Sequence, residues 1–509
     1  MFSRINSLGL RGIDGYPVTV EADISQGLPG FDVVGMAGTA VRESRDRVRA
    51  ALKNCGFAYP VSRITCNLAP ADIKKEGSVY DLPLFLSLLC AAEQLDAKLV
   101  GNAAFIGELS LAGDLRPIPG VLPMVVAARD AGFPTVYLPV DNAAEGAVVD
   151  GIEVYAVSHV TALIAHLTGE APLTPVPTQG FEPGTAKAPD FADVMGQYMP
   201  RRAMEIAAAG GHNILLIGPP GSGKSMLAKR LPSILPDLTR EEALESSAIH
   251  SIAGTLPGGV GLLTTRPFRA PHHSLSHHGL VGGGAPPRPG EVSLSHNGVL
   301  FLDELPEFSR TAMESLRQPL EDGSITISRV SASLTYPCSF MLVAAMNPCP
   351  CGFFGHPKHP CTCSPTQSRR YLSRISGPLL DRFDLHIEVP PVQYEQLASK
   401  RPAESSATIR ERVCRARARQ EARRPVTGVL TNAALPPDGL RTYCVLTAEA
   451  QHLLEETFER LDLSARAYDR ILKVARTIAD LADSDTVEAT HVAEAIQYRS
   501  MDRKYWTNR

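Results

Sequence analysis

The 509-residue sequence lacks the apolar segments that mark secreted and membrane proteins. Its first residues, MFSRINSLGLRG, contain no apolar core of a secretory signal. The longest apolar run, 82-LPLFLSLLCAA-92, is too short to span a bilayer and predicts a helix in a protein core. The ten cysteines are not spaced like a secreted disulfide framework. We therefore expect a cytoplasmic protein with no membrane partner.

The sequence also lacks an excess of positive charge. Its 50 Lys and Arg residues face 54 Asp and Glu residues, and the net charge of −4 creates no global basic field for nucleic acid. Any contact with DNA must therefore come from a local surface, such as the lining of a channel. The composition, 44% hydrophobic and 20% charged, is typical of a globular protein, and the length suits about three or four domains.

The pattern along the chain predicts an α/β protein of several domains. Strand-like and helix-like segments alternate over residues 1–168, and residues 169–190 have the Pro, Gly and Thr content of a linker. Residues 191–395 alternate again around nucleotide motifs, and residues 396–509 are helical. The expected strands of the first domain are 17–25, 62–70, 135–140 and 152–157, and its expected helices are 40–56 and 121–132. The expected C-terminal helices are 407–423, 447–461, 464–482 and 487–499.

The strongest motif is a phosphate-binding loop. In 212-HNILLIGPPGSGKSMLAKRL-231 an apolar strand, Ile214–Ile217, leads into a Gly-rich turn that a helix follows. The backbone N–H groups of such a loop wrap around phosphate oxygens, while Lys224 reaches the β- and γ-phosphates and Ser225 ligates Mg²⁺. A chance Gly-rich turn is the alternative, and the flanking strand and helix argue against it. The loop consists of Gly218, Pro219, Pro220, Gly221, Ser222, Gly223, Lys224 and Ser225.

Two further strands end in polar residues that complete a hydrolytic site. The strand in 298-GVLFLDELPEF-308 ends at Asp303, which suits Mg²⁺, and Glu304, which suits activation of the attacking water. The strand in 340-FMLVAAMN-347 ends at Asn347, which can bind that water or the γ-phosphate, although a capping Asn is the alternative. With the phosphate loop, these residues predict ATP hydrolysis.

Arginines that stabilise charge on the γ-phosphate are expected further along the chain. Arg382, in 377-GPLLDRFDLHIEVPP-391, could reach the nucleotide of a neighbouring subunit; an ion pair with one of the two nearby aspartates is the alternative. Arg466 could contact the γ-phosphate of its own subunit. Arg470 and Arg476 are its rivals, and a surface role remains an alternative for each.

In this order the motifs resemble those of AAA+ ATPases, and the segments between them resemble the magnesium-chelatase-like branch. The N-terminal domain, which carries 74-KKEGSVYDLPL-84, resembles that of Lon protease. Taken together, nearly the whole chain outside the linker is similar to the YifB/ComM family. The segments that carry the likeness to the chelatase branch are 267-PFRAPHHSLSHHGLVGGGAPPRPGEVSLSHNGVLFLDELPEF-308, 347-NPCPCG-352, 376-SGPLLDRFDLHIEVP-390 and 475-ARTIADL-481.

This resemblance implies a Lon-protease-like (ribosomal S5 domain 2-like) α/β domain, an AAA+ P-loop αβα core and a C-terminal helical lid. It implies a homohexameric, ATP-dependent DNA helicase in branch migration during natural transformation, with single-stranded, forked or branched DNA and recombinase machinery as partners. The roles that it implies are Walker A for 218–225, Walker B for Asp303 and Glu304, sensor 1 for Asn347, arginine finger for Arg382 and sensor 2 for Arg466.

Two segments are then expected to project into the channel of the ring: a helix-2 insert, 266–296, and a presensor hairpin, 323–337. A rigid structural insert with polar decoration is the alternative, although Gly282-Gly283-Gly284 would let it flex. The basic stretch 410–424, whose arginines 412, 415 and 419 share a helix face, is a weaker DNA candidate. The expected channel lining is Arg266, Arg269, Arg288, Arg329, His272, His273, His277 and His278.

A compact Cys-rich loop follows the Asn347 strand. Cys349-x-Cys351 and Cys361-x-Cys363 could enclose a tetrahedral Zn²⁺, and the many prolines of the loop prevent a hydrogen-bonded element that would order it otherwise. The spacing is C-x-C, whereas the commoner zinc signature is C-x-x-C. Free thiols, or three Cys with one His, remain open. We favour a structural Zn²⁺ on all four thiols.

Two other functions remain open. A Lon-like fold suggests an ATP-dependent peptidase, with Ser78 as nucleophile and Lys74 or Lys75 as base, but residues 79–81, Val-Tyr-Asp, stand where the nucleophile is expected. A chelatase motor that drives metal insertion into a tetrapyrrole is compatible with the ATPase motifs. The chain shows no sign of the integrin-like metal-binding domain that would accompany that function.

Overall fold

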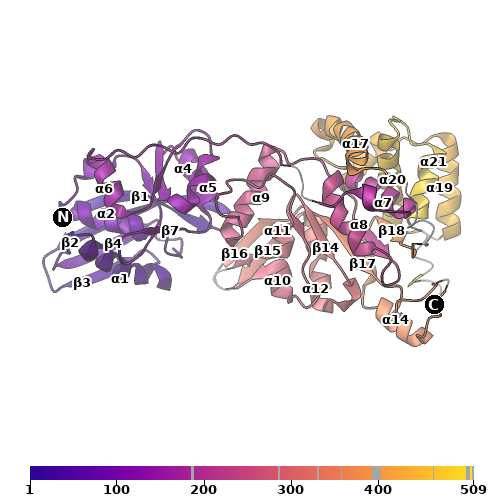
Figure 1. The fold of residues 1–509 in the computed structure, drawn as a ribbon, viewed down its shortest axis with the longest axis horizontal. Coiled ribbons are helices and arrows are strands. Elements are labelled where there is room, and N and C mark those ends of the chain that lie inside the picture. The colour runs from indigo at the N-terminus through magenta and orange to yellow at the C-terminus, as the bar shows by residue number, and fades with distance from the viewer. Residues whose placement is uncertain are drawn as a thin grey trace.

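The computed structural model describes residues 1–184, 188–284, 287–329, 332–356, 358–392, 403–461, 463–499 and 505–506. The molecule is elongated (Figure 1). An N-terminal α/β part lies at one end, a second α/β part lies in the middle, and the C-terminal helices pack on the middle part at the other end. The described helices include none with the length and apolarity needed to cross a membrane.

The N-terminal part is built on a mixed sheet with the strand order β3-β4-β2-β1-β5-β8-β9. All residues of helix α2 (Asp81–Ala91) are buried, which confirms the predicted core helix. The predicted strands and helices of this part are also confirmed. Its strands are β1 (Phe2–Arg11), β2 (Asp14–Ser25), β3 (Gly30–Val34), β4 (Arg63–Ala69), β5 (Ala104–Phe105), β8 (Thr135–Pro139) and β9 (Glu153–Val157), and its other long helices are α1 (Thr39–Asn54), α4 (Val121–Asp130) and α6 (Val160–Leu167).

Residues 169–184 of the expected linker run along the N-terminal part. The N–H of Val176 donates to the carbonyl of Val154 in edge strand β9 at 2.7 Å. Leu173, Val176 and Phe181 pack against the N-terminal core. The segment therefore contributes to this part of the molecule instead of passing freely through solvent, because an edge strand leaves backbone groups available for pairing.

The middle part contains a parallel sheet with the strand order β11-β14-β17-β10-β18. Both faces of the sheet are covered, which explains why its strands are almost continuously apolar. The carboxyl ends of parallel strands share one edge, so the residues that follow β10, β14 and β17 are brought together. The strands are β10 (Ile214–Ile217), β11 (Phe268–Arg269), β14 (Val299–Leu302), β17 (Met341–Met346) and β18 (Leu385–Glu388).

One face of this sheet shares a core with α7, α8 and the C-terminal helices, and the other packs against the helix-2 insert and the hairpin β15–β16. The four predicted C-terminal helices are confirmed. The elements of the first face are α7 (Tyr198–Gly210), α8 (Lys224–Arg230), α17 (Ser406–Thr427), α18 (Pro437–Tyr443), α19 (Ala448–Leu461), α20 (Ala465–Leu481) and α21 (Ala489–Gln497). Those of the second include α10 (His277–Val281), α12 (Arg310–Ser315), β15 (Ser324–Arg329) and β16 (Ala332–Pro337).

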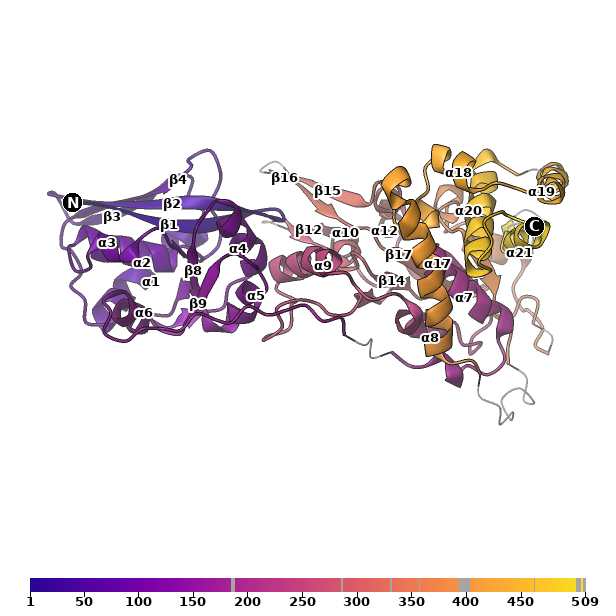
Figure 2. The ribbon, with the colours of Figure 1, turned by 90° about the horizontal axis from the view of Figure 1, so that it is seen from above.

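Contacts between the N-terminal part and the middle part include two that involve α9 (Arg240–Ala253) and the β15–β16 hairpin. Helix α9 packs on α4, where the Ser251 carbonyl accepts from the Gly120 N–H at 3.0 Å. The turn between β1 and β2 reaches the β15–β16 hairpin, and the Leu334 side chain lies against Gly12 (Figure 2). A cavity of about 1020 Å³ lies between these contacts, lined by residues of both parts.

Candidate nucleotide site

The Gly-rich loop between β10 and α8 has the backbone conformation that its glycines predict. Gly221 and Gly223 have φ angles of 76° and 94°, in the left-handed region that side chains disfavour. Gly223 is the N-cap of α8, which begins at Lys224. The loop therefore curls at the carboxyl end of β10, where its N–H groups can surround a phosphate.

Lys224 is the centre of this loop. Its Nζ donates to two carbonyl groups of the loop at 2.8 and 2.9 Å and to Asn347 Oδ1 at 3.2 Å. Burial lowers the pKa of the Lys224 ammonium, and the nearby carboxylates of Asp303 and Glu304 oppose that shift. The fold thus brings together the ends of three strands that are far apart in the sequence.

Ser225 and Asp303 form the predicted oxygen pair. The Ser225 hydroxyl donates to Asp303 Oδ2 at 2.6 Å, and Asp303 Oδ1 accepts from the N–H of Glu304 at 2.9 Å. Hydroxyl and carboxylate oxygens are the donors that Mg²⁺ prefers, so these residues fit that ion. Glu304 has a φ angle of 51°, a conformation that residues other than glycine rarely adopt and that is frequent at functional sites.

His273 contacts the predicted catalytic carboxylate. Its Nδ1 lies 3.2 Å from Glu304 Oε2, and its ring lies beside those of His272 and Phe308. His273 belongs to the insert between β11 and α10, so this contact links the insert to the hydrolytic site. The sequence predicts His273 only as a channel-lining residue, because no local pattern pairs it with a strand end 31 positions away.

Gln197 holds the phosphate loop from behind. Its Nε2 donates to the carbonyls of Ser222 at 3.2 Å and Pro390 at 2.6 Å, which ties the loop to the segment after β18. Gln197 is buried and has a φ angle of 53°. No sequence motif marks this residue. Its role in positioning the phosphate loop is seen from its contacts in the fold.

Arg382 pairs with a different carboxylate from those that the sequence suggests. Its guanidinium contacts Glu321, in the helix before β15, and neither of the two nearby aspartates. The side chain is 18% exposed, and its Nε has no hydrogen-bond partner. The other nearby arginine, Arg374, donates to Glu307 Oε2 at 2.9 Å, just beyond Glu304.

The three sensor-2 candidates differ sharply in exposure. Arg476 is 1% exposed and its guanidinium is satisfied inside the C-terminal helices, by Asp480 and by backbone carbonyls. The Arg470 side chain is 11% exposed and lies 3.5 Å from Asp384. The Arg466 side chain is 65% exposed. Of the three, Arg466 has the guanidinium most available to a ligand.

A buried polar network joins the parallel sheet to α20. His212 Nδ1 lies 3.2 Å from Asp384 Oδ2, and His212 Nε2 lies 2.8 Å from the Thr477 hydroxyl. Burial would raise the pKa of Asp384, but the His212 hydrogen bond and the charges of His212 and Arg470 outweigh it and lower that pKa. The C-terminal helices are thus fastened to the sheet by charge-assisted contacts.

Two of the arginines expected in the channel lining form ion pairs within the chain. Arg266 pairs with Glu242 of α9 at 2.8 Å, and Arg269 pairs with Glu291 at 2.7 Å. The fold brings these acids close from distant parts of the chain, so the two arginines fasten the insert. Arg288, His272 and His278 are exposed and His273 and His277 are partly buried, whereas the side chain of Arg329 lies outside the described residues.

The basic stretch in α17 also forms ion pairs within the molecule. Arg412 contacts Glu205 and Glu404, and Arg419 contacts Asp485. The weaker Arg415 pair, with Asp483, spans 3.9 Å. These contacts favour the alternative of a solvated, paired helix face over a DNA surface.

The β15–β16 hairpin has one apolar and one hydroxyl-rich face. The buried residues Ile325, Ile327 and Tyr336 pack toward the middle part. On the exposed face, hydroxyl groups pair across the strands, at 2.9 Å between Thr326 and Thr335 and at 3.0 Å between the serines at 328 and 333. Residues 330 and 331 lie outside the described residues.

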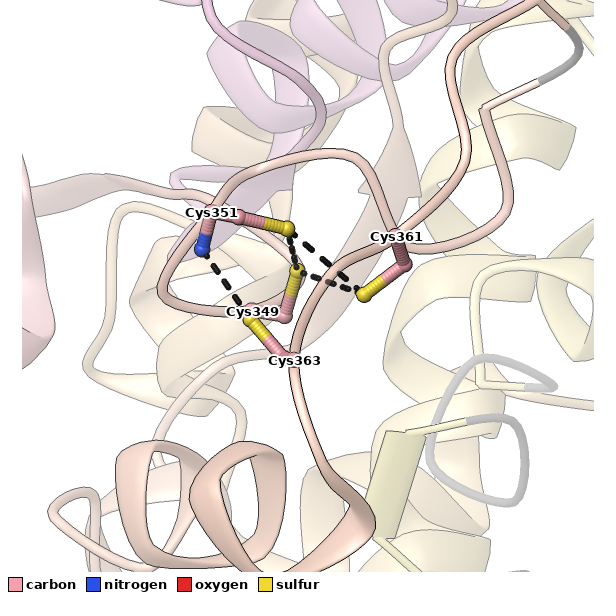
Figure 3. A group of neighbouring side chains, drawn as sticks. All are labelled: Cys349, Cys351, Cys361 and Cys363. Atoms are coloured by element: carbon pink, nitrogen blue, oxygen red, sulfur yellow. Dashed lines mark hydrogen bonds between the residues drawn. The ribbon is translucent and has the colours of Figure 1, made fainter.

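The four cysteines of the loop after β17 converge (Figure 3). Their Sγ atoms all lie within 4.8 Å of one another. The Cys349 Sγ lies 3.4 Å from Cys351 Sγ and 3.6 Å from Cys361 Sγ, and Cys363 Sγ accepts from the Cys351 N–H at 3.3 Å. All four are free thiols. The fold therefore assembles the predicted set.

Backbone N–H groups surround these sulfur atoms. Burial disfavours ionisation of the Cys351 thiol, but hydrogen bonds from the N–H groups of Phe353 and Thr362 and from neighbouring thiols lower its pKa to about 5. Burial, together with the neighbouring thiols, raises the pKa of Cys349 to about 12. Of these two thiols, Cys351 therefore ionises more easily than Cys349.

The predicted peptidase residues are not arranged as a catalytic pair. The Ser78 hydroxyl donates to Glu108, and the buried Lys75 donates to the carbonyl of Pro70. Lys74 pairs with Glu76 at 2.5 Å. Among the hydrogen bonds of the described residues none joins Ser78 to a lysine, so the geometry gives no support to peptide hydrolysis.

Three stretches of the chain match family models of known proteins. Residues 190–397 match a family model described as magnesium chelatase, subunit ChlI, residues 20–142 match subunit ChlI of Mg-chelatase, and residues 403–499 match the ChlI C-terminal model.

Full-length relatives support the same assignment. The chain is 47% identical over 504 residues to the uncharacterized protein YifB of Escherichia coli, covering 98% of this chain and 97% of the relative. It is 44% identical over 498 residues to the competence protein ComM of Haemophilus influenzae, covering 97% and 96%. A shorter match, 28% over 169 residues, covers 31% of this chain and 21% of the Lon protease of Mycolicibacterium smegmatis.

Proposed function

Because the chain belongs to the YifB/ComM family of magnesium-chelatase-like AAA+ ATPases, we propose that it is a homohexameric DNA motor. In this proposal ATP hydrolysis moves single-stranded, forked or branched DNA through the ring and promotes branch migration in recombination during natural transformation. A relative that is 44% identical over nearly its full length is named a competence protein. The proposal places the motor in the cytoplasm, with recombinase machinery as a further partner.

The observation that carries the proposal is the convergence of strand ends at one edge of the parallel sheet. Lys224, Ser225, Asp303 and Asn347 are joined there by hydrogen bonds of 2.6 to 3.2 Å. Glu304 follows Asp303 directly and extends its carboxylate from the same strand end. A phosphate loop, two carboxylates and a polar strand end are the parts that phosphoryl transfer to water requires.

Each residue then has one task in hydrolysis. Lys224 and the loop N–H groups hold the phosphate oxygens, Asn347 orients the attacking water, and Glu304 accepts the proton of that water. Ser225 and Asp303 would hold Mg²⁺, which when bound neutralises negative charge on the phosphates.

Arg382 is proposed to act on the nucleotide of the neighbouring subunit. Its contact with Glu321 leaves the Nε–H group without a hydrogen-bond partner. If the guanidinium left Glu321 to bind a phosphate, its positive charge would still be paired with a negative one. Arg466 is proposed to contact the nucleotide of its own subunit, since it is the most exposed of the three candidates.

The coupling to DNA is proposed to run through the insert and the hairpin. The exposed hydroxyl groups of the hairpin, including Thr326 and Thr335, suit hydrogen bonds to phosphate oxygens, which depend little on sequence. The insert carries His273 to the carboxylate of Glu304. A displacement of these segments by DNA would therefore reach the hydrolytic residue through one contact.

The proposed cofactors are Mg²⁺ with ATP and a structural Zn²⁺ on the thiols of Cys349, Cys351, Cys361 and Cys363. The Mg²⁺ belongs to the reaction. The Zn²⁺ belongs to the loop that follows Asn347, and its four-thiol set leaves no open position for catalysis.

The test is ATP turnover by the purified protein with and without single-stranded and forked DNA. We expect DNA to stimulate turnover and Glu304→Gln to abolish it, while Glu307→Gln, an identical change three residues further on, retains it. Turnover that is indifferent to DNA would contradict the DNA motor and favour a chelatase-like motor, and turnover retained in Glu304→Gln would contradict the assignment of the water-activating residue.

A further inference from the structure

The loop that holds the four thiols has no regular structure to order it. Between β17, which ends at Met346, and α14 (Pro365–Leu372), the described residues form no helix or strand. Loops of this length are uncommon without a function of their own. Two backbone turns, ring contacts of Phe353 with His356 and His359, and the four converging thiols are the contacts that order it.

We propose that a Zn²⁺ held by these thiols braces the phosphate loop, so that ATP affinity depends on the bound metal. The dependence of ATP affinity on the metal rests on the proposed function. The zinc site itself does not rest on it, because the thiols converge whether or not the protein moves DNA.

The spacing of the sulfur atoms fits a tetrahedral zinc. Zn–S bonds of about 2.3 Å give a tetrahedron with edges of about 3.8 Å. Three of the sulfur pairs lie at 3.4, 3.6 and 3.6 Å, and every pair lies within 4.8 Å. These distances are far longer than the roughly 2.05 Å of a disulfide bond.

The surroundings of the sulfur atoms also fit a metal centre. The N–H group of Cys351 donates to the Cys363 sulfur at 3.3 Å. Such outer hydrogen bonds stabilise metal-bound thiolates and fix their orientation. On binding, the thiols that are still protonated release their protons to solvent, four Zn–S bonds replace bonds from the metal to water, and the oxidation states of zinc and sulfur stay the same.

The loop is in direct contact with the phosphate loop. Gly352 lies between the two thiol pairs, and a Cβ atom at this position would lie 2.4 Å from Cδ of Pro220. The backbone of the thiol loop therefore presses on the Walker A turn at a distance that only glycine allows. Two residues before Cys349, Asn347 accepts the hydrogen bond of Lys224.

A metal that fixes this loop thus fixes two neighbours of the phosphates at once. Loss of the metal frees a segment of many prolines to move away from Pro220 and to carry Asn347 with it. Small displacements of positioning groups cost about ten- to a hundredfold in function. We expect a loss of ATP affinity in that range when the metal is absent.

The first experiment measures metal content and ATP affinity in the full-length protein. Elemental analysis should find about one Zn²⁺ per chain in wild type and in Cys414→Ser, a free thiol outside the loop, and much less in Cys361→Ser. Binding of a fluorescent ATP analogue should weaken about tenfold in Cys361→Ser only. Absence of zinc from wild type, even after incubation with ZnSO₄, would overturn the metal site.

The second experiment keeps the proposal testable if Cys361→Ser fails to fold. Zinc is removed from folded wild type with a chelator and restored with ZnSO₄, and ATP affinity should fall and recover. Zinc released with unchanged affinity would overturn the brace and leave the metal site standing.

The contact itself is tested in Pro220→Ala, which should retain its zinc while its ATP affinity becomes less sensitive to zinc removal. An undiminished sensitivity would overturn the route through Pro220. All of these readouts are independent of DNA, so a failure of the DNA motor would leave them interpretable.

Discussion

Arg476→Ala is expected to destabilise the C-terminal helices without removing a nucleotide contact. The Arg476 guanidinium is almost fully buried and donates to the carbonyls of Asp485, at 2.7 Å, and Ser484. Loss of two part-buried hydrogen bonds from a charged donor costs about 1.5–3 kcal/mol each, and Asp480 keeps its contact with Arg423. Together with the cavity left by the side chain, the free energy of unfolding should fall by about 3–5 kcal/mol.

The assay is thermal unfolding, with Arg466→Ala as the matched arginine deletion on the same helix. The Arg476→Ala transition should fall by on the order of 10 °C. Arg466 is largely exposed, so its removal should change the free energy of unfolding by less than about 0.5 kcal/mol while it slows ATP turnover. If Arg476→Ala unfolds at the same temperature as wild type and hydrolyses ATP poorly, Arg476 is the sensor-2 residue and its structural role is wrong.

Further predictions concern the coupling, the pH dependence and the hairpin. His273→Ala should free Glu304 and raise DNA-independent ATP turnover by on the order of tenfold, whereas His272→Ala should leave it unchanged; equal rates in both would contradict the coupling. The pKa of Asp384 is lowered in the folded protein, so the stability that it contributes is present above about pH 4 and is lost as the pH falls through the folded-state pKa. The melting temperature of Asp384→Asn should therefore vary less with pH below about pH 4 than that of wild type. The same pH dependence in both proteins would contradict a stabilising role of Asp384. Thr326→Glu should weaken DNA binding about tenfold in fluorescence anisotropy at low salt, and unchanged binding would remove the hairpin from the DNA surface.

Features that depend on near neighbours in the sequence could be predicted. The phosphate loop needs only a strand, its glycines and a helix, and Asp303 and Asn347 each end an apolar strand. Helix α20 was predictable because its buried residues recur at helical spacing. The convergence of the thiols followed from their symmetric C-x-C spacing within one loop.

Features that depend on tertiary contacts could not be predicted. Strand β1 escaped the sequence pattern because Ser3 and Ser7 are buried in it, and Ser3 donates to the Ser87 carbonyl at 2.7 Å. Polar residues at core positions hide the alternation that marks a strand. The acidic partners of Arg266 and Arg382 lie at least 24 positions away in the sequence. Whether these arginines form ion pairs within the chain therefore could not be predicted without the fold.

The most direct test of the central claim is branch movement on DNA. A synthetic three-stranded junction with a labelled displaced strand is incubated with the protein, ATP and Mg²⁺, and the strand released is measured over time. Strand release should require hydrolysable ATP and should be absent in Lys224→Ala and Glu304→Gln. A protein that hydrolyses ATP in the presence of the junction and moves no strand would contradict the claim.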